Sequence, residues 1–249
     1  MIMLPVLVSG PEKGNRMPFG RSLAWRTGMA AAVLVSLALV VPMTARAQDE
    51  YTSIFTDGGL KGAGWGRCVT AIVWDADVSD LSPRAAKNSV ADLDWAISTW
   101  AAAAGVQVSR GAEAKLVYDN SSATVAAPGA GPGKRKLYVK FVKDSDSNYL
   151  SGRVVGVATP TSVIPDAPEI IGGSAAFRVD YVEYASKSES RTLLLHELGH
   201  ALGLGHSNNK KSVMFPIVTK TVKLAPSDVA GIKAFTKNCD PAFDAMRSQ

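Results

Sequence analysis

Three histidines and a glutamate lie close together in this chain of 249 residues, and their types and spacing could form a metal site. His196 and His200 are four residues apart, Glu197 lies between them, and His206 follows six residues later. The preceding residues are apolar, which favours a helix, and four residues turn a helix by about 400°. Both imidazoles then project from one face and can bind the same ion. No other histidine occurs in the chain.

The residues around this helix predict a catalytic zinc site rather than a structural one. Gly203 tolerates a positive φ angle, so the helix can end there and His206 can return as a third ligand. Three imidazoles with an open fourth position are typical of catalytic zinc, which lowers the pKa of a bound water to about 7. Glu197 would act as the general base toward that water. The alternatives are histidines that are merely buried in a core and an exposed helix carboxylate at Glu197.

These residues resemble the metzincin zinc proteases, whose pattern is H-E-x-x-H-x-x-G-x-x-H followed by a methionine turn. Ser207 follows the third histidine, and the run Ser212-Val213-Met214-Phe215-Pro216 places a methionine eight residues after His206. Both features are similar to the matrixin branch, and the chain most resembles its compact secreted bacterial members. The resemblance implies that Met214 lies beneath the metal as an apolar floor without binding it. The alternative is an ordinary buried methionine in a turn.

The resemblance also implies an α/β (α+β) fold over residues 65–240. It would consist of a mixed twisted sheet with a long backing helix, an active-site helix and a C-terminal helix, the last around Leu224–Ile232. In this family the strand before the site pairs with extended substrate, and residues 154–159 are the candidate. We therefore expect substrate to pair with Val154, Val155, Gly156, Val157 and Ala158. Residues 217–225 would line the pocket for the substrate residue after the cut.

The hydrophobic pattern predicts the individual elements. Ser82-Pro83 begins a helix that ends at Gly105 and carries four apolar residues at helical spacing: Val90, Leu93, Ile97 and Trp100. Strands are predicted at residues 68–74, 106–108, 116–118, 137–141, 154–159 (ending at Pro160) and 175–182. Residues 121–133 are rich in Ser, Ala, Gly and Pro, and we expect them to form a solvated, mobile loop.

The first 47 residues have the order of a secretory signal. Positive charges precede an apolar run of 13 residues from Met29 to Val41, and Ala45-Arg46-Ala47 matches an Ala-x-Ala cleavage site. The run is shorter than the roughly 20 residues of a membrane-spanning helix, so we expect export with cleavage near Ala47 rather than a permanent anchor. A start at Met17 instead of Met1 would give a more typical signal. Residues 48–64 are then expected to form a flexible lead-in and residues 241–249 a tail.

Charge and cysteine content restrict the partners. Most of the formal charge of +5 lies in the first 47 residues, so the rest of the chain is nearly neutral and nucleic acid is not an expected partner. We expect a monomer that binds a polypeptide substrate.

Cys68 and Cys239 are the two cysteines, and in an exported protein such a pair is most simply a disulfide. The alternative is a reactive thiol.

The chain departs from the family in ways that restrict its cofactors. No Pro-Arg-Cys-Gly segment precedes the domain, and without a histidine outside the motif the second, structural zinc of animal matrixins lacks its usual ligands. One catalytic Zn²⁺ is therefore expected. Calcium is left undecided, because Asp144, Asp146 and Asp166 are as easily solvent-facing loop residues as oxygen ligands.

Together these features predict a secreted zinc endopeptidase that hydrolyses peptide bonds with metal-activated water. Two alternatives stay open: a non-catalytic secreted zinc-binding or cell-surface module, and a zinc hydrolase that acts on cell-wall peptides. Glu197 argues against the first, because metal binding alone does not need that carboxylate. An exposed strand edge beside the metal would favour extended peptides, and a closed pocket would favour a small substrate.

Overall fold

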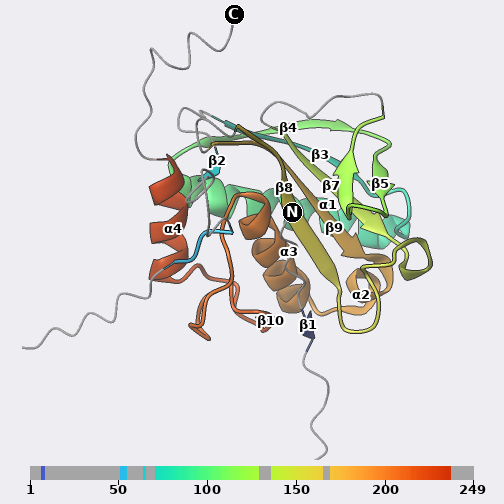
Figure 1. The fold of residues 1–249 in the computed structure, drawn as a ribbon. Coiled ribbons are helices and arrows are strands. Elements are labelled where there is room, and N and C mark those ends of the chain that lie inside the picture. Colours follow the sequence, from blue (N-terminus) through green and yellow to red (C-terminus); the bar gives the residue numbers. More distant parts are fainter. Residues whose placement is uncertain are drawn as a thin grey trace, which may run out of the picture. The chain divides into compact units, whose positions relative to one another are not determined.

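The computed structural model of the protein describes residues 7–8, 51–54, 64–65, 71–128, 136–164 and 169–236, and a six-stranded sheet forms the centre of this part of the chain. The sheet has the order β4 (Gln107–Glu113), β3 (Ala71–Asp77), β7 (Lys136–Val142), β9 (Glu169–Arg178) and β8 (Gly156–Ile164), and β2 (Gly64–Trp65) pairs with the start of β9. All pairs are parallel except β8 with β9 (Figure 1). The predicted mixed sheet is therefore confirmed, with β8 at its edge.

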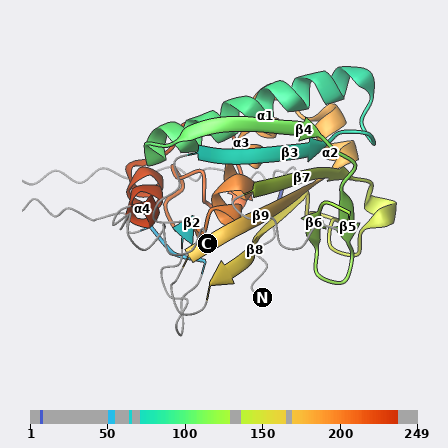
Figure 2. The same ribbon diagram turned by 90° about the horizontal axis from the view of Figure 1, so that it is seen from above.

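Helices cover one face of this sheet (Figure 2). The long helix α1 (Pro83–Ala104) packs on β3 and β4, and α3 (Lys187–Ala201) packs on β8 and β9. The C-terminal helix α4 (Pro226–Thr236) contacts α1 and β2. The core between helices and sheet contains large side chains that are almost completely buried: Trp74, Trp100, Phe141, Phe177 and Leu193. The predicted backing, active-site and C-terminal helices are all present.

Local signals at both ends explain where α1 lies. The Ser82 side chain accepts a hydrogen bond from the Ala85 N–H at 3.3 Å, and Pro83 occupies the first turn, where no N–H is needed. Gly105 adopts a left-handed φ of 77°, and its N–H donates to the Ala101 carbonyl. Leu93, Ile97 and Trp100 are buried as the spacing predicts. The sequence prediction for this helix is confirmed at both ends.

Helix α3 begins with a capping box. The Ser186 side chain accepts the Glu189 N–H, and the Glu189 carboxylate accepts the Ser186 N–H at 3.0 Å. From Thr192 to Ala201 every residue is buried, so the helix has an exposed first turn and an apolar remainder. Buried packing on all sides holds the second half of α3 in place, and this half carries His196 and His200.

Several strand limits differ from the prediction: β4 continues to Glu113 instead of ending at residue 108, and β9 begins at Glu169 instead of at residue 175. Residues 179–182 are not a strand, because α2 (Val179–Tyr184) begins where β9 ends. There the Asp180 carboxylate accepts the Tyr181 N–H and pairs with Arg178, and these local polar contacts favour a helical turn. The strand β8 does not end at Pro160 but continues to Ile164. Proline is tolerated there because β8 is an edge strand whose register shifts next to Pro160.

The predicted mobile loop at residues 121–133 is partly wrong. Strands β5 (Val117–Asp119) and β6 (Thr124–Ala126) form an antiparallel hairpin, and Ala123 and Val125 are buried. They pack with Tyr138, Val142 and Val157 on the sheet face opposite α1 and α3. Strand β5 corresponds to the strand predicted at residues 116–118, whereas the pattern of β6 is too brief to be recognised in the sequence. Residues 129–133 lie outside the described part.

The remaining described residues include the start of β3, a small parallel pair of strands, a short 3₁₀ turn and a segment near the N-terminus. The strand β3 covers the second half of the predicted strand 68–74, whose first three residues lie outside the described part. Strand β10 (Ile217–Val218) pairs in parallel with β1 (Leu7–Val8), and a 3₁₀ turn covers Asp144–Asp146. Residues 51–54, expected in a flexible lead-in, instead include a buried Ile54 and a bridge from Ser53 to Leu204. None of the described helices is both long and apolar enough to cross a bilayer.

A buried carboxylate joins the end of β3 to β7. Asp77 accepts hydrogen bonds from the Lys140 ammonium at 2.6 Å, the Leu116 N–H at 2.9 Å, and both the N–H and the hydroxyl of Ser79. Burial raises the pKa of Asp77, but these hydrogen bonds outweigh burial and lower the pKa from 3.8 to about 2. The folded state therefore favours the ionised form, which stabilises the protein above pH 4 and loses this effect as the pH falls toward 2.

We predict that Asp77→Asn lowers the free energy of unfolding of the metal-free protein at pH 7 by about 2 kcal/mol, since it removes this stabilisation. The difference from the wild type should shrink as the pH falls below 4. Denaturant unfolding over a pH series measures both effects. Asp94→Asn is the control, because Asp94 is half-exposed and lies 4.0 Å from Arg110, so its change should stay within about 0.5 kcal/mol. A difference for Asp77→Asn that does not depend on pH would contradict this account.

Candidate metal centre

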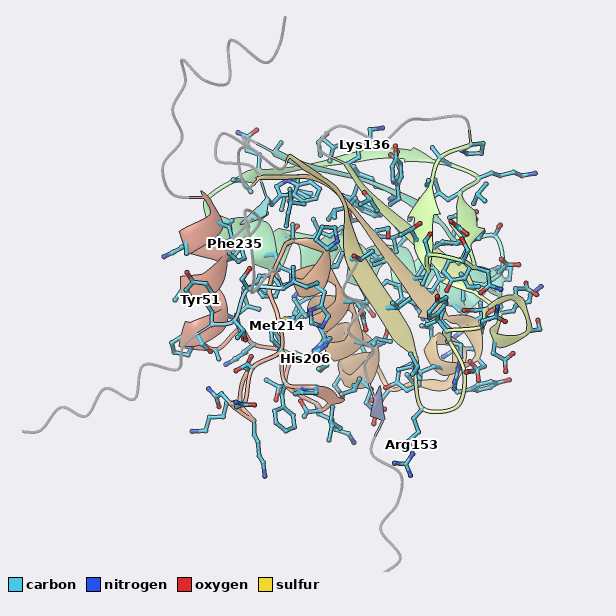
Figure 3. All side chains as sticks on the ribbon, viewed as in Figure 1. Tyr51, Lys136, Arg153, His206, Met214 and Phe235 are labelled. Carbon is cyan, nitrogen blue, oxygen red and sulfur yellow. The ribbon has the colours of Figure 1, made fainter. Side chains whose placement is uncertain are left out.

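The three histidines converge at the end of α3. The Nε2 atoms of His196 and His200 lie 2.9 Å apart, and one ring nitrogen from each of the three histidines lies within 4.8 Å of the others. Helical spacing brings the first two together, and Gly203, with a φ of 106°, lets the chain turn after the helix so that His206 returns (Figure 3). Zinc–nitrogen bonds of about 2.1 Å separate tetrahedral ligands by roughly 3.3 Å, so one ion can reach all three rings.

Two backbone carbonyls determine which nitrogen of each helical histidine carries the proton. The Nδ1 of His196 lies 2.7 Å from the Val213 carbonyl, and the Nδ1 of His200 lies 2.7 Å from the Leu204 carbonyl. A carbonyl only accepts, so both Nδ1 atoms donate and both Nε2 atoms carry lone pairs. Two lone pairs therefore face each other at 2.9 Å. A cation between them removes their repulsion, and the donor set fits zinc.

The protonation states of the rings also suit a metal. Burial, together with the neighbouring histidines, holds the pKa of His196 well below its usual 6.5. Burial also lowers the pKa of His200 to about 3 and lowers the pKa of His206. All three imidazoles are therefore neutral at neutral pH, which is the form that binds metal ions. The Nε2 of His206 is buried and has no hydrogen-bond partner among the described residues.

Glu197, the residue after His196, is completely buried. Neither of its carboxylate oxygens has a hydrogen-bond partner in the described part of the chain, and burial raises its pKa well above 4.5. Gly156, the first residue of β8, lies directly against it: a β-carbon there would be 2.6 Å from Glu197 Oε1. Glycine at this position therefore makes room for the carboxylate. The interpretation of Glu197 as an exposed helix carboxylate is wrong.

The methionine turn packs against α3 near its C-terminal end. Met214 is buried, and a β-carbon on Gly199 would lie 2.4 Å from its sulfur, so only glycine allows this approach. The Ser207 N–H donates to the Met214 carbonyl at 2.9 Å, which ties the turn to the residue after the third histidine. Figure 3 shows Met214 next to His206. Its role as an apolar floor beneath the metal stays a prediction.

A family model for matrixin matches residues 81–236, which is more than half of the chain and includes α1, the histidines, the methionine turn and α4. The chain belongs to the matrixin family. The predicted relationship to metzincins of the matrixin branch is therefore confirmed.

Individual relatives match shorter stretches of this matrixin. Macrophage metalloelastase of Oryctolagus cuniculus is 46% identical over 112 residues, which are 41% of this chain and 23% of the relative. Matrix metalloproteinase-19 of Homo sapiens is 49% identical over 56 residues (21% and 11%), and Metalloendoproteinase 2-MMP of Arabidopsis thaliana is 32% identical over 71 residues (27% and 18%). The chain thus spans less than a quarter of the length of these relatives.

The predicted substrate strand lies at the sheet edge beside the site. Gly156, Val157 and Ala158 belong to β8, whereas Val154 and Val155 precede it. The Arg178 N–H donates to the Val155 carbonyl at 2.9 Å, and the Arg178 guanidinium donates to the Gly152 carbonyl, so the approach to β8 is well fixed. Among the described strands β8 pairs only with β9, and its Val157, Ala158 and Thr159 are at most 2% exposed. Substrate binding by this strand stays a prediction.

The other candidate ligands and cavities do not extend this site. Within the described residues the three histidines are the only group of three or more His, Cys, Asp or Glu placed to hold an ion, so Asp144 and Asp146 do not form one. Asp166 and the predicted Cys68–Cys239 disulfide lie outside the described residues. A cavity of about 690 Å³ lies at the first turns of α1 and α3, and no histidine lines it. Its Glu183 already caps α1 through Ser82.

Asp228 supports the metal centre, although the sequence did not predict this role. Asp228, buried in the first turn of α4, accepts hydrogen bonds from the Ser212 hydroxyl, the Val213 N–H at 3.1 Å and the Ala225 N–H at 2.8 Å. Val213 in turn provides the carbonyl that orients His196. A carboxylate at the start of a helix resembles an ordinary helix-capping residue, so the sequence contained no separate signal for this contact.

We predict that Asp228→Asn destabilises the protein by about 2 kcal/mol, because an amide that replaces one oxygen places N–H donors against backbone N–H groups. It should also weaken zinc binding through His196. Denaturant unfolding with and without zinc measures both effects, and Asp146→Asn, on an exposed turn, is the matched control. An Asp228→Asn protein as stable as the control would show that the contact is not needed.

Proposed function

We propose that this matrixin is a zinc-dependent endopeptidase that hydrolyses peptide bonds within polypeptides. One observation carries the proposal: three neutral imidazoles converge on one point, and the residue after the first of them, Glu197, is a completely buried carboxylate. His196, His200 and His206 would hold the ion, and Glu197 would be the general base. A bound zinc ion supplies polarisation of the scissile carbonyl and makes water more acidic.

Glu197 has the properties of a proton carrier in this reaction. As water attacks the carbonyl carbon, the carboxylate accepts one of its protons, and the resulting carboxylic acid then protonates the departing amine. Burial supports both steps, because it raises the pKa of Glu197 and so makes the carboxylate a stronger base. Met214 would support the histidines from below without contacting substrate.

The edge of β8 supports a polypeptide substrate. An extended chain could pair with the main-chain groups of β8 beside Gly156, which places a peptide bond near Glu197. Residues 217–225 follow the methionine turn and would line the pocket for the residue after the cut. Their Ile217 is 37% exposed and offers an apolar surface.

We further propose the localisation, oligomeric state, disulfide and cofactor that the sequence predicts. The protein would be exported after cleavage near Ala47 and act as a monomer, with residues 65–240 as the catalytic domain and Cys68 paired with Cys239. One Zn²⁺ would be its cofactor. The nearly neutral mature chain gives no basis for nucleic-acid binding.

We predict that Glu197→Gln keeps the zinc and loses the activity. Cleavage of a denatured protein should fall by about 10²- to 10⁴-fold, which is the usual contribution of a general base. Metal analysis should still find one zinc per chain, and a chelator should abolish cleavage by the wild type. Glu189→Gln is the matched control, since it makes the same change on the same helix at a capping position.

Three results distinguish the proposal from its rivals. Equal cleavage by Glu197→Gln and the wild type would refute the base assignment. Zinc binding without any cleavage by the wild type would favour a non-catalytic module. Cleavage of short cell-wall peptides but not of denatured protein would favour the other hydrolase.

A further inference from the structure

We propose that residues 51–54, here called the N-terminal clamp, hold the third histidine in position for the metal, with Thr52 as the positioning residue. The inference rests on the metal site of the proposed function. Figure 1 shows the clamp as a short blue segment between α4 and the end of α3. The loop that it contacts, Gly203–His206, connects α3 to the third ligand.

Main-chain hydrogen bonds join the clamp to this loop. The Ile54 N–H donates to the Gly203 carbonyl at 2.8 Å, the Gly205 N–H donates to the Thr52 carbonyl at 2.8 Å, and Ser53 forms an antiparallel bridge with Leu204. The contact is close, because a β-carbon on Gly205 would lie 2.8 Å from the Ser53 carbonyl oxygen. The clamp therefore acts as a short strand against the ligand loop.

The side chain of Thr52 extends this pairing to the ligand itself. Its hydroxyl donates to the backbone carbonyl of His206. The clamp is in turn attached to α4, where the rings of Tyr51 and Phe235 meet edge to face with centroids 5.9 Å apart (Figure 3). Ile54, at the other end, is buried. Thr52 thus lies between two fixed residues.

The third histidine needs this support more than the other two. His196 and His200 lie in a buried helix, and a backbone carbonyl orients each ring. No hydrogen bond within the described residues fixes the ring of His206, which follows a loop with glycines at 203 and 205. Glycine loses more conformational freedom on ordering than other residues, so an unsupported loop would hold its ligand poorly. Hydrogen bonds to the ring orient His196 and His200. For His206, the main-chain contacts of the clamp would take over this role.

The test uses the zinc-loaded full chain and compares three variants. Thr52→Val keeps the shape but removes the hydroxyl, Thr52→Ser restores it, and Thr99→Val is a matched control. Thr99 also donates its hydroxyl to a backbone carbonyl, that of Trp95 at 2.8 Å, but within α1. The rate of zinc release to a chromogenic chelator is measured for each protein, and thermal unfolding of the metal-free proteins shows whether overall stability has changed.

We expect Thr52→Val to release zinc about tenfold faster than the wild type, as is usual when support of a ligand is lost. Thr52→Ser and Thr99→Val should stay within about twofold of the wild type. The visible spectrum of the Co²⁺-loaded protein should change in Thr52→Val alone, because it reports ligand geometry rather than stability.

Other outcomes would overturn the inference. An unchanged release rate in Thr52→Val, or equal acceleration in Thr52→Ser, would show that the hydroxyl does not position the ligand. Equal acceleration in Thr99→Val would attribute the effect to general stability. A full chain that binds no zinc would overturn both this inference and the proposed function, whereas tight zinc binding without peptide cleavage would overturn only the latter.

Discussion

The two helical imidazoles of this matrixin face each other with unprotonated nitrogens. Carbonyls of Val213 and Leu204 accept the Nδ1 protons of His196 and His200, so the Nε2 lone pairs meet at 2.9 Å in a buried place. Such an arrangement is unfavourable unless a cation lies nearby. The buried half of α3 and these two carbonyls support the rings in this position.

Three separate parts of the chain supply this support. The buried half of α3 holds two rings, and α4 holds the methionine turn through Asp228 and thereby the carbonyl that orients His196. The clamp joins the loop before His206. The edge strand β8 completes the site from the fourth side, because Gly156 lies against Glu197.

The differences between the predicted and observed elements have a common cause. Short segments such as β6 and α2 depend on contacts with distant residues, and their own patterns are too brief to distinguish strand, helix and loop. Val125 is buried because Tyr138 and Val142 lie on the facing side of the sheet. Pro160 does not stop β8 because the strand is at an edge, which no local pattern reveals.

The sequence alone was sufficient to predict the family, the convergence of the histidines and the buried face of the long helix, because helical spacing and cap residues act over a few positions. Only the tertiary structure could bring Asp228, Gly156 and Thr52 to the site, since each is separated from the histidines by a long stretch of chain or by a turn of undefined direction. A local pattern specifies which side chains share one face of a helix. Contacts between distant segments depend on how the whole sheet and its helices pack. No local sequence pattern specifies this packing.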